Sequence, residues 1–232
     1  FCLLAKISFT QITFDYSGAE LLIEYFFNDK KENIAKIINH PGYLHVFEHS
    51  KKYSSSPLDQ KLLKSSLLGQ SNAFNYTSIE ERLDTLRQII TYLKANEQLM
   101  KEEFGKLPLK YLPDDYQQKV EVFFIVGGYN GIAMDGKVAI NIDWQQFRKD
   151  KQEIFLYLSH ELFHIGFERY QAAPDIFSIK TVNELKYLVM YFTMNEGLAT
   201  LVPYQYRTFI NALKDYDYTV LMDSTLLAQK LQ

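Results

Sequence analysis

The sequence contains one cysteine, Cys2, so no disulfide bond can form within the chain, and cysteine usage does not indicate a redox compartment. It also has no surplus of positive charge, since 25 Lys and Arg residues face 28 Asp and Glu residues, for a net charge of −3. We therefore expect no nucleic-acid partner, because basic side chains are needed to neutralise phosphates. No apolar run approaches the roughly 18 residues that cross a bilayer, so we expect a soluble chain with no transmembrane segment.

What is present is typical of a globular protein. A chain of 232 residues is long enough for one sizeable domain or for two small lobes that share a cleft. Its 17 Tyr and 17 Phe predict an aromatic core. Because the chain begins at Phe1 and not at a methionine, residues 1–5 are either the remnant of an export signal or a cut end. The compartment (cytoplasmic, or exported with the signal removed), the oligomeric state and the completeness of both ends stay open.

The first half of the sequence has helical periodicity. Between residues 19 and 98, apolar residues recur at intervals of three and four, with breakers at Pro41-Gly42, residues 54–57 and Gly69. Ser78-Ile79-Glu80-Glu81 has the form of a capping box that opens a helix. This pattern predicts a helical N-terminal lobe over residues 1–112.

The character of the sequence changes after Pro113. Residues 120–126 and 138–142 are continuous apolar runs that predict two buried strands. Between them, residues 127–136 are rich in glycine and can present bare backbone to a ligand. This stretch is interpreted either as a sheet edge beside a cleft or as an ordinary hairpin with a long loop. Two helices are then predicted over residues 154–167 and 182–202, the second ending at Pro203.

The motif His160-Glu161-Leu162-Phe163-His164 places two histidines and a glutamate on the first of these two helices. Residues four apart lie on one face of a helix, so both imidazoles can bind a single metal ion. Glu161 flanks that face and can take a proton from metal-bound water and deliver it to a leaving amine. Without partners, such groups on an apolar helix would cost several kcal/mol. We therefore expect a catalytic zinc site, with histidines hydrogen-bonded in the core or at the surface as the alternative.

A second histidine pair has the reversed order HxxEH, in His45-Val46-Phe47-Glu48-His49, which other zinc peptidases also place on a helix. This pair runs directly into the polar stretch of residues 50–54. We interpret these histidines as solvated or partly packed near a helix C-terminus, whose dipole favours their charge, and not as a metal site.

A catalytic zinc needs a third protein ligand and one open position for water. Glu184 and Glu196 are 12 residues apart on one predicted helix, so they lie roughly 18 Å apart along its axis and only one can bind. Glu184 has the last position of a capping box, whereas Glu196 is followed by the small residues Gly197 and Ala199, which would let the two helices approach. We favour Glu196 and keep Glu184 as the alternative. The less favoured candidates are Glu168 and Asp175.

These features resemble a gluzincin, a zinc peptidase whose HExxH helix is completed by a glutamate on a later helix. The stretch Asn195-Glu196-Gly197-Leu198-Ala199 resembles the Glu-Gly-x-Ala element of several uncharacterised bacterial families of zinc-dependent peptidases, and Asn39-His40-Pro41-Gly42-Tyr43 is similar to a motif of one such family. Ala133-Met134-Asp135 resembles part of the Gly-Ala-Met-Glu-Asn element of aminopeptidases, with a shorter acidic residue. The resemblance implies a sheet edge along which an extended peptide adds as a further strand. The candidate residues for that edge are Tyr129, Asn130, Gly131 and Ala133.

The sequence departs from the gluzincin pattern at two points. The aspartate that often follows the ligand glutamate by four residues and orients a histidine is replaced by Thr200, so another residue has to orient the histidines. Gluzincins also supply a Tyr or His from a C-terminal lobe to stabilise the oxyanion, and only 36 residues follow Glu196. Tyr204 and Tyr206 are the candidates for that role.

We therefore predict an α+β, mostly helical, zincin-like chain with a catalytic region over residues 113–232. Truncation of this region at its C-terminus stays open. The expected activity is hydrolysis of a peptide or protein substrate, with Zn²⁺ held by His160, His164 and Glu196 and with Glu161 as the general base. One alternative is a non-catalytic peptide- or protein-binding module that retains the zincin scaffold, against which the intact Glu161 argues. The other is a helical interaction protein without metal.

Overall fold

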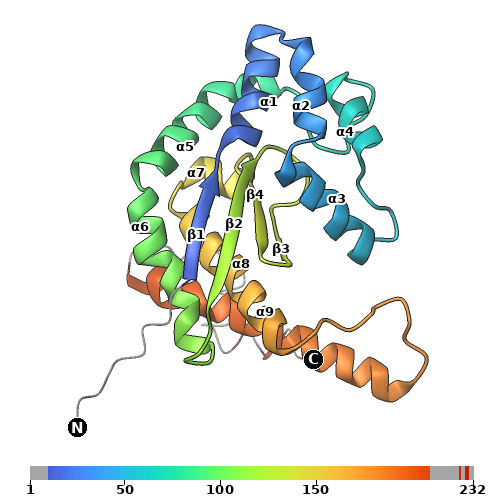
Figure 1. Cartoon of the computed structure of the whole chain (residues 1–232), viewed down its shortest axis with the longest axis vertical. Helices are drawn as coiled ribbons and strands as arrows, with labels where there is room; N and C mark the ends of the chain where they lie inside the picture. The colour runs from blue at the N-terminus through green and yellow to red at the C-terminus, as the bar shows by residue number, and fades with distance from the viewer. Residues whose placement is uncertain (1–9, 210–224, 226–227, 230–232) are drawn as a thin grey trace.

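A four-stranded sheet lies at the centre of the structure, a computed structural model that describes residues 10–209, 225 and 228–229 (Figure 1). Its strands are β1 (Thr10–Asp15), β2 (Gln118–Ile125), β3 (Gly131–Met134) and β4 (Lys137–Asn141). In the order β1-β2-β4-β3, strand β2 pairs in parallel with β1 and with β4, and β3 pairs antiparallel with β4. Strand β3 is therefore an edge strand whose direction opposes that of the other three.

The two apolar runs form β2 and β4, as predicted, and the glycine-rich stretch contains β3. Asp135 and Gly136 join β3 to β4 with φ angles of 51° and 76°, the left-handed pair of a tight hairpin turn. The glycine-rich stretch is thus a sheet edge and a hairpin at once. Strand β1 was not predicted, because its parallel partner begins 108 residues later (Thr10 pairs with Gln118) and local patterns do not reveal such pairing.

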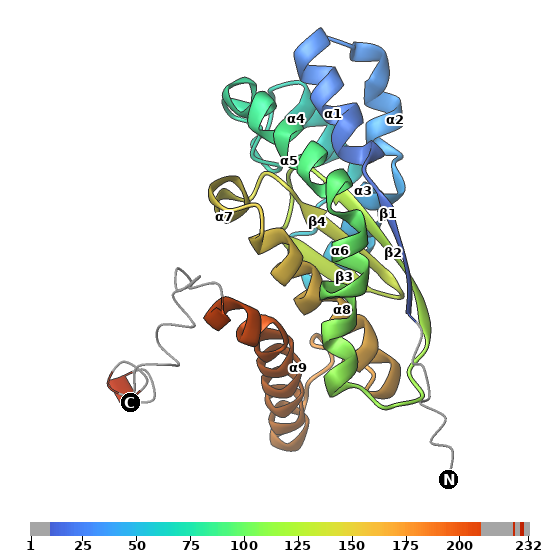
Figure 2. The ribbon, with the colours of Figure 1, turned by 90° about the vertical axis from the view of Figure 1, so that its left-hand side faces the viewer.

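Helices cover both faces of the sheet, so β2 is buried from both sides (Figures 1 and 2). One face is covered by α1 (Ser17–Asn28) and α3 (Pro41–Tyr53). Helix α3 lies so close to the sheet that a Cβ at Gly42 would be 2.8 Å from the Cβ of Phe123 in β2. On the other face, near α6 (Glu97–Glu102), η3 (Phe104–Tyr111) and α8 (Glu153–Tyr170), the ring of Tyr16 stacks on Phe124 at 5.0 Å. The remaining helices are η1 (Lys31–Asn33), α2 (Ile34–Ile38), α4 (Gln60–Leu67), η2 (Ile79–Arg82), α5 (Leu83–Ala95), α7 (Gln145–Lys149) and α9 (Val182–Phe209).

The motif of residues 39–43 fixes the start of α3 on the sheet. His40 Nδ1 accepts a hydrogen bond from the Gly42 backbone N–H (3.1 Å), so in the neutral ring Nε2 carries the proton and donates toward Ser17 Oγ (2.9 Å). The Ser17 hydroxyl in turn donates to Asp15 Oδ1 (2.6 Å). Because His40 Nε2 is a donor, these three side chains are a helix cap and not a nucleophilic triad. The buried Tyr43 donates its hydroxyl to the backbone carbonyl that follows β2 (2.8 Å).

Helix α9 begins where predicted but continues through Pro203, so its expected end at Val202 is wrong. A proline removes one backbone hydrogen bond and usually ends a helix. Here Ala199, Val202 and Pro203 are buried, and packing of α9 against α8 and η3 outweighs the local propensity. No helix in the described part of the chain is long and apolar enough to span a membrane.

Candidate metal centre and active-site cleft

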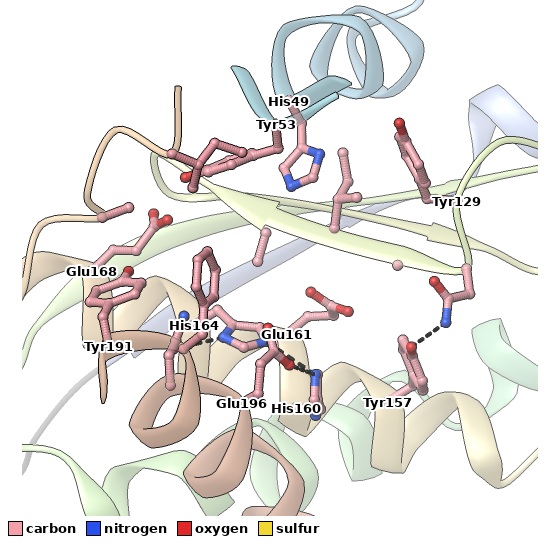
Figure 3. A pocket seen from close by; sticks show the side chains of 18 residues that line it. His49, Tyr53, Tyr129, Tyr157, His160, Glu161, His164, Glu168, Tyr191 and Glu196 are labelled. Atoms are coloured by element: carbon pink, nitrogen blue, oxygen red, sulfur yellow. Dashed lines mark hydrogen bonds and ion pairs between the residues drawn. The ribbon is translucent and has the colours of Figure 1, made fainter. Parts of the chain in front are cut away.

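Three side chains from two helices bring their ligand atoms together. His160 and His164 lie one turn apart on α8 with their Nε2 atoms 3.0 Å apart, and Glu196 Oε2 of α9 lies 3.6 Å from each (Figure 3). Tetrahedral zinc with bonds near 2.0–2.1 Å separates neighbouring ligand atoms by about 3.3 Å. The observed separations lie on either side of this value, so this donor set fits one ion with a fourth position open.

The hydrogen bond of His164 sets the state of its other nitrogen. His164 Nδ1 lies 2.8 Å from Asn195 Oδ1, and both side chains are buried. An amide oxygen only accepts, so Nδ1 carries the proton and Nε2 presents its lone pair to His160 and Glu196, as a metal ligand must. Asn195 therefore holds the His164 ring in this tautomer and orientation.

Glu161 is the buried carboxylate beside this cluster, with 4% of its surface exposed. It lies directly against the backbone of β3, since a Cβ at Gly131 would be 2.6 Å from Glu161 Oε1. Burial, and secondarily the charge of Glu196, raise the pKa of Glu161 to about 8. A cation bound by the three ligand side chains would offset the charge of Glu196 and favour the ionised form of Glu161.

A cavity of about 450 Å³ lies beside the edge strand β3, between the C-terminal end of α3 and the helices α8 and α9. In Figure 3, His49 and Tyr53 of α3 lie on one side of β3, and His160, Glu161 and His164 lie on the other. The four residues predicted for the substrate edge all line this cavity: Tyr129, Asn130, Gly131 and Ala133.

Other predicted residues lie elsewhere. Glu184 is exposed, and its carboxylate accepts hydrogen bonds from the backbone N–H groups of Lys180 and Thr181 (both 2.8 Å), which lower its pKa and form the predicted cap. Tyr204 is not among the described residues that line the cavity, and the side chain of Tyr206 lies outside the described residues. A Cβ at Gly197 would meet no described atom within 4 Å, so the expectation that this glycine lets the helices approach is wrong; the buried Ala199 occupies the packed face.

Of the second histidine pair, His49 is partly buried, within the expectation of solvated or partly packed rings, whereas His45 is fully buried. The expectation that the helix dipole favours their charge is wrong, because burial lowers both pKa values. Helix α3 turns His45 toward the sheet, where only 2% of its surface is exposed and burial lowers its pKa to about 4. His49 lines the cavity, with its ring centre 4.8 Å from that of Tyr53 and 5.8 Å from that of Tyr129. Burial is also the main cause that lowers the pKa of His49 to about 4, so the ring facing the His160–His164–Glu196 cluster is neutral.

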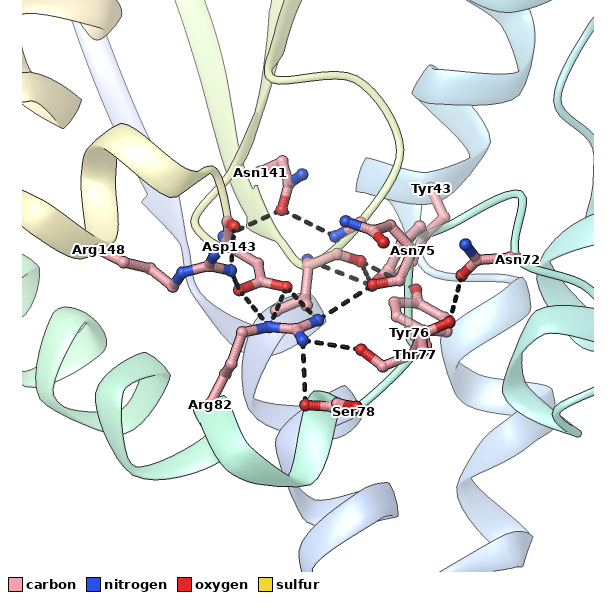
Figure 4. Close-up of polar contacts among 12 residues, drawn as sticks. Tyr43, Asn72, Asn75, Tyr76, Thr77, Ser78, Arg82, Asn141, Asp143 and Arg148 are labelled. Atoms are coloured by element: carbon pink, nitrogen blue, oxygen red, sulfur yellow. Dashed lines mark hydrogen bonds and ion pairs between the residues drawn. The ribbon is translucent and has the colours of Figure 1, made fainter.

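A second cavity, of about 400 Å³, borders a network of hydrogen bonds around the buried Asp143. Both Arg82 and Arg148 form ion pairs with this carboxylate (Figure 4). The guanidinium of Arg82 also donates to three backbone carbonyls of the preceding loop, those of Asn75, Thr77 and Ser78. The network holds this loop against the end of β4, which is a structural role.

The comparison with protein families agrees with this geometry. A family model described as "Putative zinc dependent peptidase (DUF5700)" matches residues 14–230. The chain belongs to this family. No curated protein and no solved structure matches the chain. Membership in this family confirms the coarser part of the resemblance, a family described as putative zinc-dependent peptidases.

Several cavity residues of this family member were missed by the sequence prediction. Asn195 precedes Glu196, and an amide next to a candidate ligand is an available signal for an orienting residue. Tyr157 lies three residues before His160 on the same helix face and stacks on its ring at 5.5 Å, so helical spacing was the available signal. His49 and Tyr191 come from other elements, and no local pattern places them at this cavity.

Proposed function

We propose that this chain is a gluzincin-type zinc peptidase that hydrolyses peptide bonds. His160, His164 and Glu196 would hold the zinc, and Glu161 would be the general base. The observation that carries this proposal is the convergence of three ligand atoms, within 4.8 Å of one another, beside the buried carboxylate of Glu161 in an open cavity. The general base supports catalysis over a purely structural zinc site, which needs no proton acceptor.

The roles of the side chains follow from their positions. A bound zinc would polarise the scissile carbonyl and lower the pKa of a coordinated water. Glu161 takes one proton from the attacking water as its oxygen bonds to the carbonyl carbon, and delivers that proton to the amine nitrogen as the C–N bond breaks. Asn195 keeps the His164 ring in the tautomer and orientation that a metal requires.

The edge strand supports a peptide as the substrate. Strand β3 ends the sheet, so its outer backbone groups can pair with an extended chain, a common mode of peptide recognition. Gly131 of this strand lies against Glu161, so a peptide bound along β3 would lie next to the proposed general base. The neutral His49 faces the same cavity from α3.

The test is metal content and turnover measured together on protein purified without a histidine tag. We expect about one zinc per chain and hydrolysis of a mixed peptide library, read by mass spectrometry. Glu161→Gln should keep the zinc and lower kcat by at least about 100-fold, the scale of general-base loss. Bound zinc without hydrolysis would support a non-catalytic binding module, and absence of zinc would refute both.

A further inference from the structure

One end of the cavity carries a carboxylate that the proposed mechanism does not use. Glu168 lies one turn after His164 on α8 and lines the same cavity. In Figure 3 it lies beside Tyr191 and below Tyr53, at the end opposite Tyr157. The Tyr53 hydroxyl and a backbone N–H in the β3–β4 turn stabilise its charged form, yet burial is the larger effect and raises its pKa.

The charge around this end is negative. The described residues that line the cavity include no lysine or arginine, and of the three glutamates among them Glu161 and Glu196 belong to the candidate metal centre, which leaves Glu168 at this end. The charges that act on Glu168 are those of Lys52 and Asp135, neither of which lines the cavity. The single ammonium group of Lys52 thus balances only one of the two carboxylates of Glu168 and Asp135, which leaves one negative charge without a counterpart. His49, which also faces the cavity, is neutral and does not compensate it.

Tyr191 provides an independent observation at the same end. Its side chain is 3% exposed and lines the cavity, and its hydroxyl has no hydrogen-bond partner among the described residues. A buried hydroxyl without a partner costs roughly 1–3 kcal/mol, so native structures rarely leave one in place. The phenol oxygen beside Glu168 adds an acceptor to that of the carboxylate (Figure 3).

We propose that Glu168 and Tyr191 form a subsite for a positively charged nitrogen of the substrate, either a Lys or Arg side chain or the α-ammonium of a peptide. Such a group has donors only, so it needs the acceptors that this end of the cavity presents. Ala173 and Ile176, from the loop after α8, line the same cavity and supply apolar surface for an aliphatic stem. This inference rests on the proposed peptidase function and adds its substrate class.

The experiment uses zinc-loaded protein and peptides in which each position is occupied in turn by Lys, Arg, Gln or norleucine, with the amino terminus free or acetylated. We expect one cationic position to raise kcat/KM by about 10- to 100-fold over its neutral analogue, the scale of a charge-assisted hydrogen bond. Loss of the preference on acetylation would assign it to the α-ammonium, and its persistence to a side chain. Glu168→Gln should remove the preference, measured as the ratio of kcat/KM on the cationic peptide to kcat/KM on its neutral analogue.

Glu48→Gln is the matched control, because Glu48 is exposed on α3 and is not among the cavity-lining residues. It should keep the preference, and Tyr191→Phe should reduce it. Equal loss on cationic and neutral peptides in Glu168→Gln, or no preference in the unmodified protein, would overturn the proposal. If Glu168→Gln loses zinc or unfolds, Tyr191→Phe becomes the deciding variant. A Tyr191→Phe protein that keeps the full preference for the cationic peptide would overturn the subsite. If no peptide is cleaved, the peptidase proposal fails, and anisotropy of fluorescein-labelled Lys and norleucine peptides tests the subsite by itself.

Discussion

At Gly131 the backbone of β3 passes so close to α8 that a single methyl group should disable the site. A Cβ at this position would lie 2.6 Å from Glu161 Oε1 and 2.8 Å from Tyr157 Cε1, so both side chains, or the strand itself, have to move. Glu161 is buried, and the Tyr157 ring stacks on His160 at 5.5 Å, so the movement displaces the proposed general base and disturbs a proposed metal ligand. A misplacement of about 1 Å can cost about 100-fold in rate. We expect Gly131→Ala to lower kcat by about that factor and to destabilise the fold by about 1–3 kcal/mol through overpacking.

The assay measures kcat and KM on one cleavable peptide, zinc content by mass spectrometry and the free energy of unfolding in urea. Gly197→Ala is the matched control, because it adds the same methyl group next to Glu196 where no described atom lies within 4 Å. It should keep kcat and stabilise the helix by about 0.5–1 kcal/mol. A Gly131→Ala protein with zinc and an unchanged kcat would refute the close approach of β3 to the general base.

The remaining predictions concern the ligands, their support and the fold. Glu196→Ala should weaken zinc binding by at least about 10-fold, whereas Glu184→Ala should cost about 1 kcal/mol of stability and keep the zinc; a zinc titration in which only Glu184→Ala loses the metal would reverse the assignment. Asn195→Ala should weaken zinc binding by about 10- to 100-fold in the same titration, and an unchanged affinity would show that Asn195 does not orient His164. Asp143→Asn should cost about 3 kcal/mol in urea unfolding, because it leaves two guanidinium groups without their carboxylate, with kcat per folded chain unchanged. Metal-free protein should lose stability as the pH rises from about 4.5 to about 8, because folded Glu161, with its raised pKa, holds its proton longer than the unfolded chain does; Glu161→Gln should remove this slope in pH-dependent unfolding.

The part of the site that was predictable from sequence is the part fixed by helix geometry. The four-residue spacing of His160 and His164 places both rings on one face whatever surrounds the helix. The choice of Glu196 over Glu184 used the same geometry with a capping box, and the structure brings Glu196, and not Glu184, to the histidines. Both inferences needed only local rules.

The rest of the site depends on contacts between distant segments, which local patterns do not contain. Asn195 and His164 are 31 residues apart and meet only because α9 packs on α8. His49 reaches the cavity because α3 lies over the edge of the sheet. Local sequence does not contain this contact, and it predicted only a solvated or partly packed pair. Local sequence does not predict β1 for the same reason, because its six residues pair with β2 in the other half of the chain.

The N-terminal half contributes side chains to the wall of the cleft and is not only a neighbouring lobe. The His40 ring fixes the start of α3 to Asp15 and Ser17 at the end of β1, and the Tyr43 hydroxyl fixes it to the carbonyl that follows β2. From these anchors the helix carries His49 and Tyr53 to the cavity. Strand β1 completes the sheet from the same half. A catalytic region beginning at residue 113 would thus keep the HExxH helix and Glu196 but lose one wall of the cleft and a strand partner of β2. The family match over residues 14–230 begins near the end of β1 and includes α3 together with α8 and α9, so the family model contains both walls of the cleft.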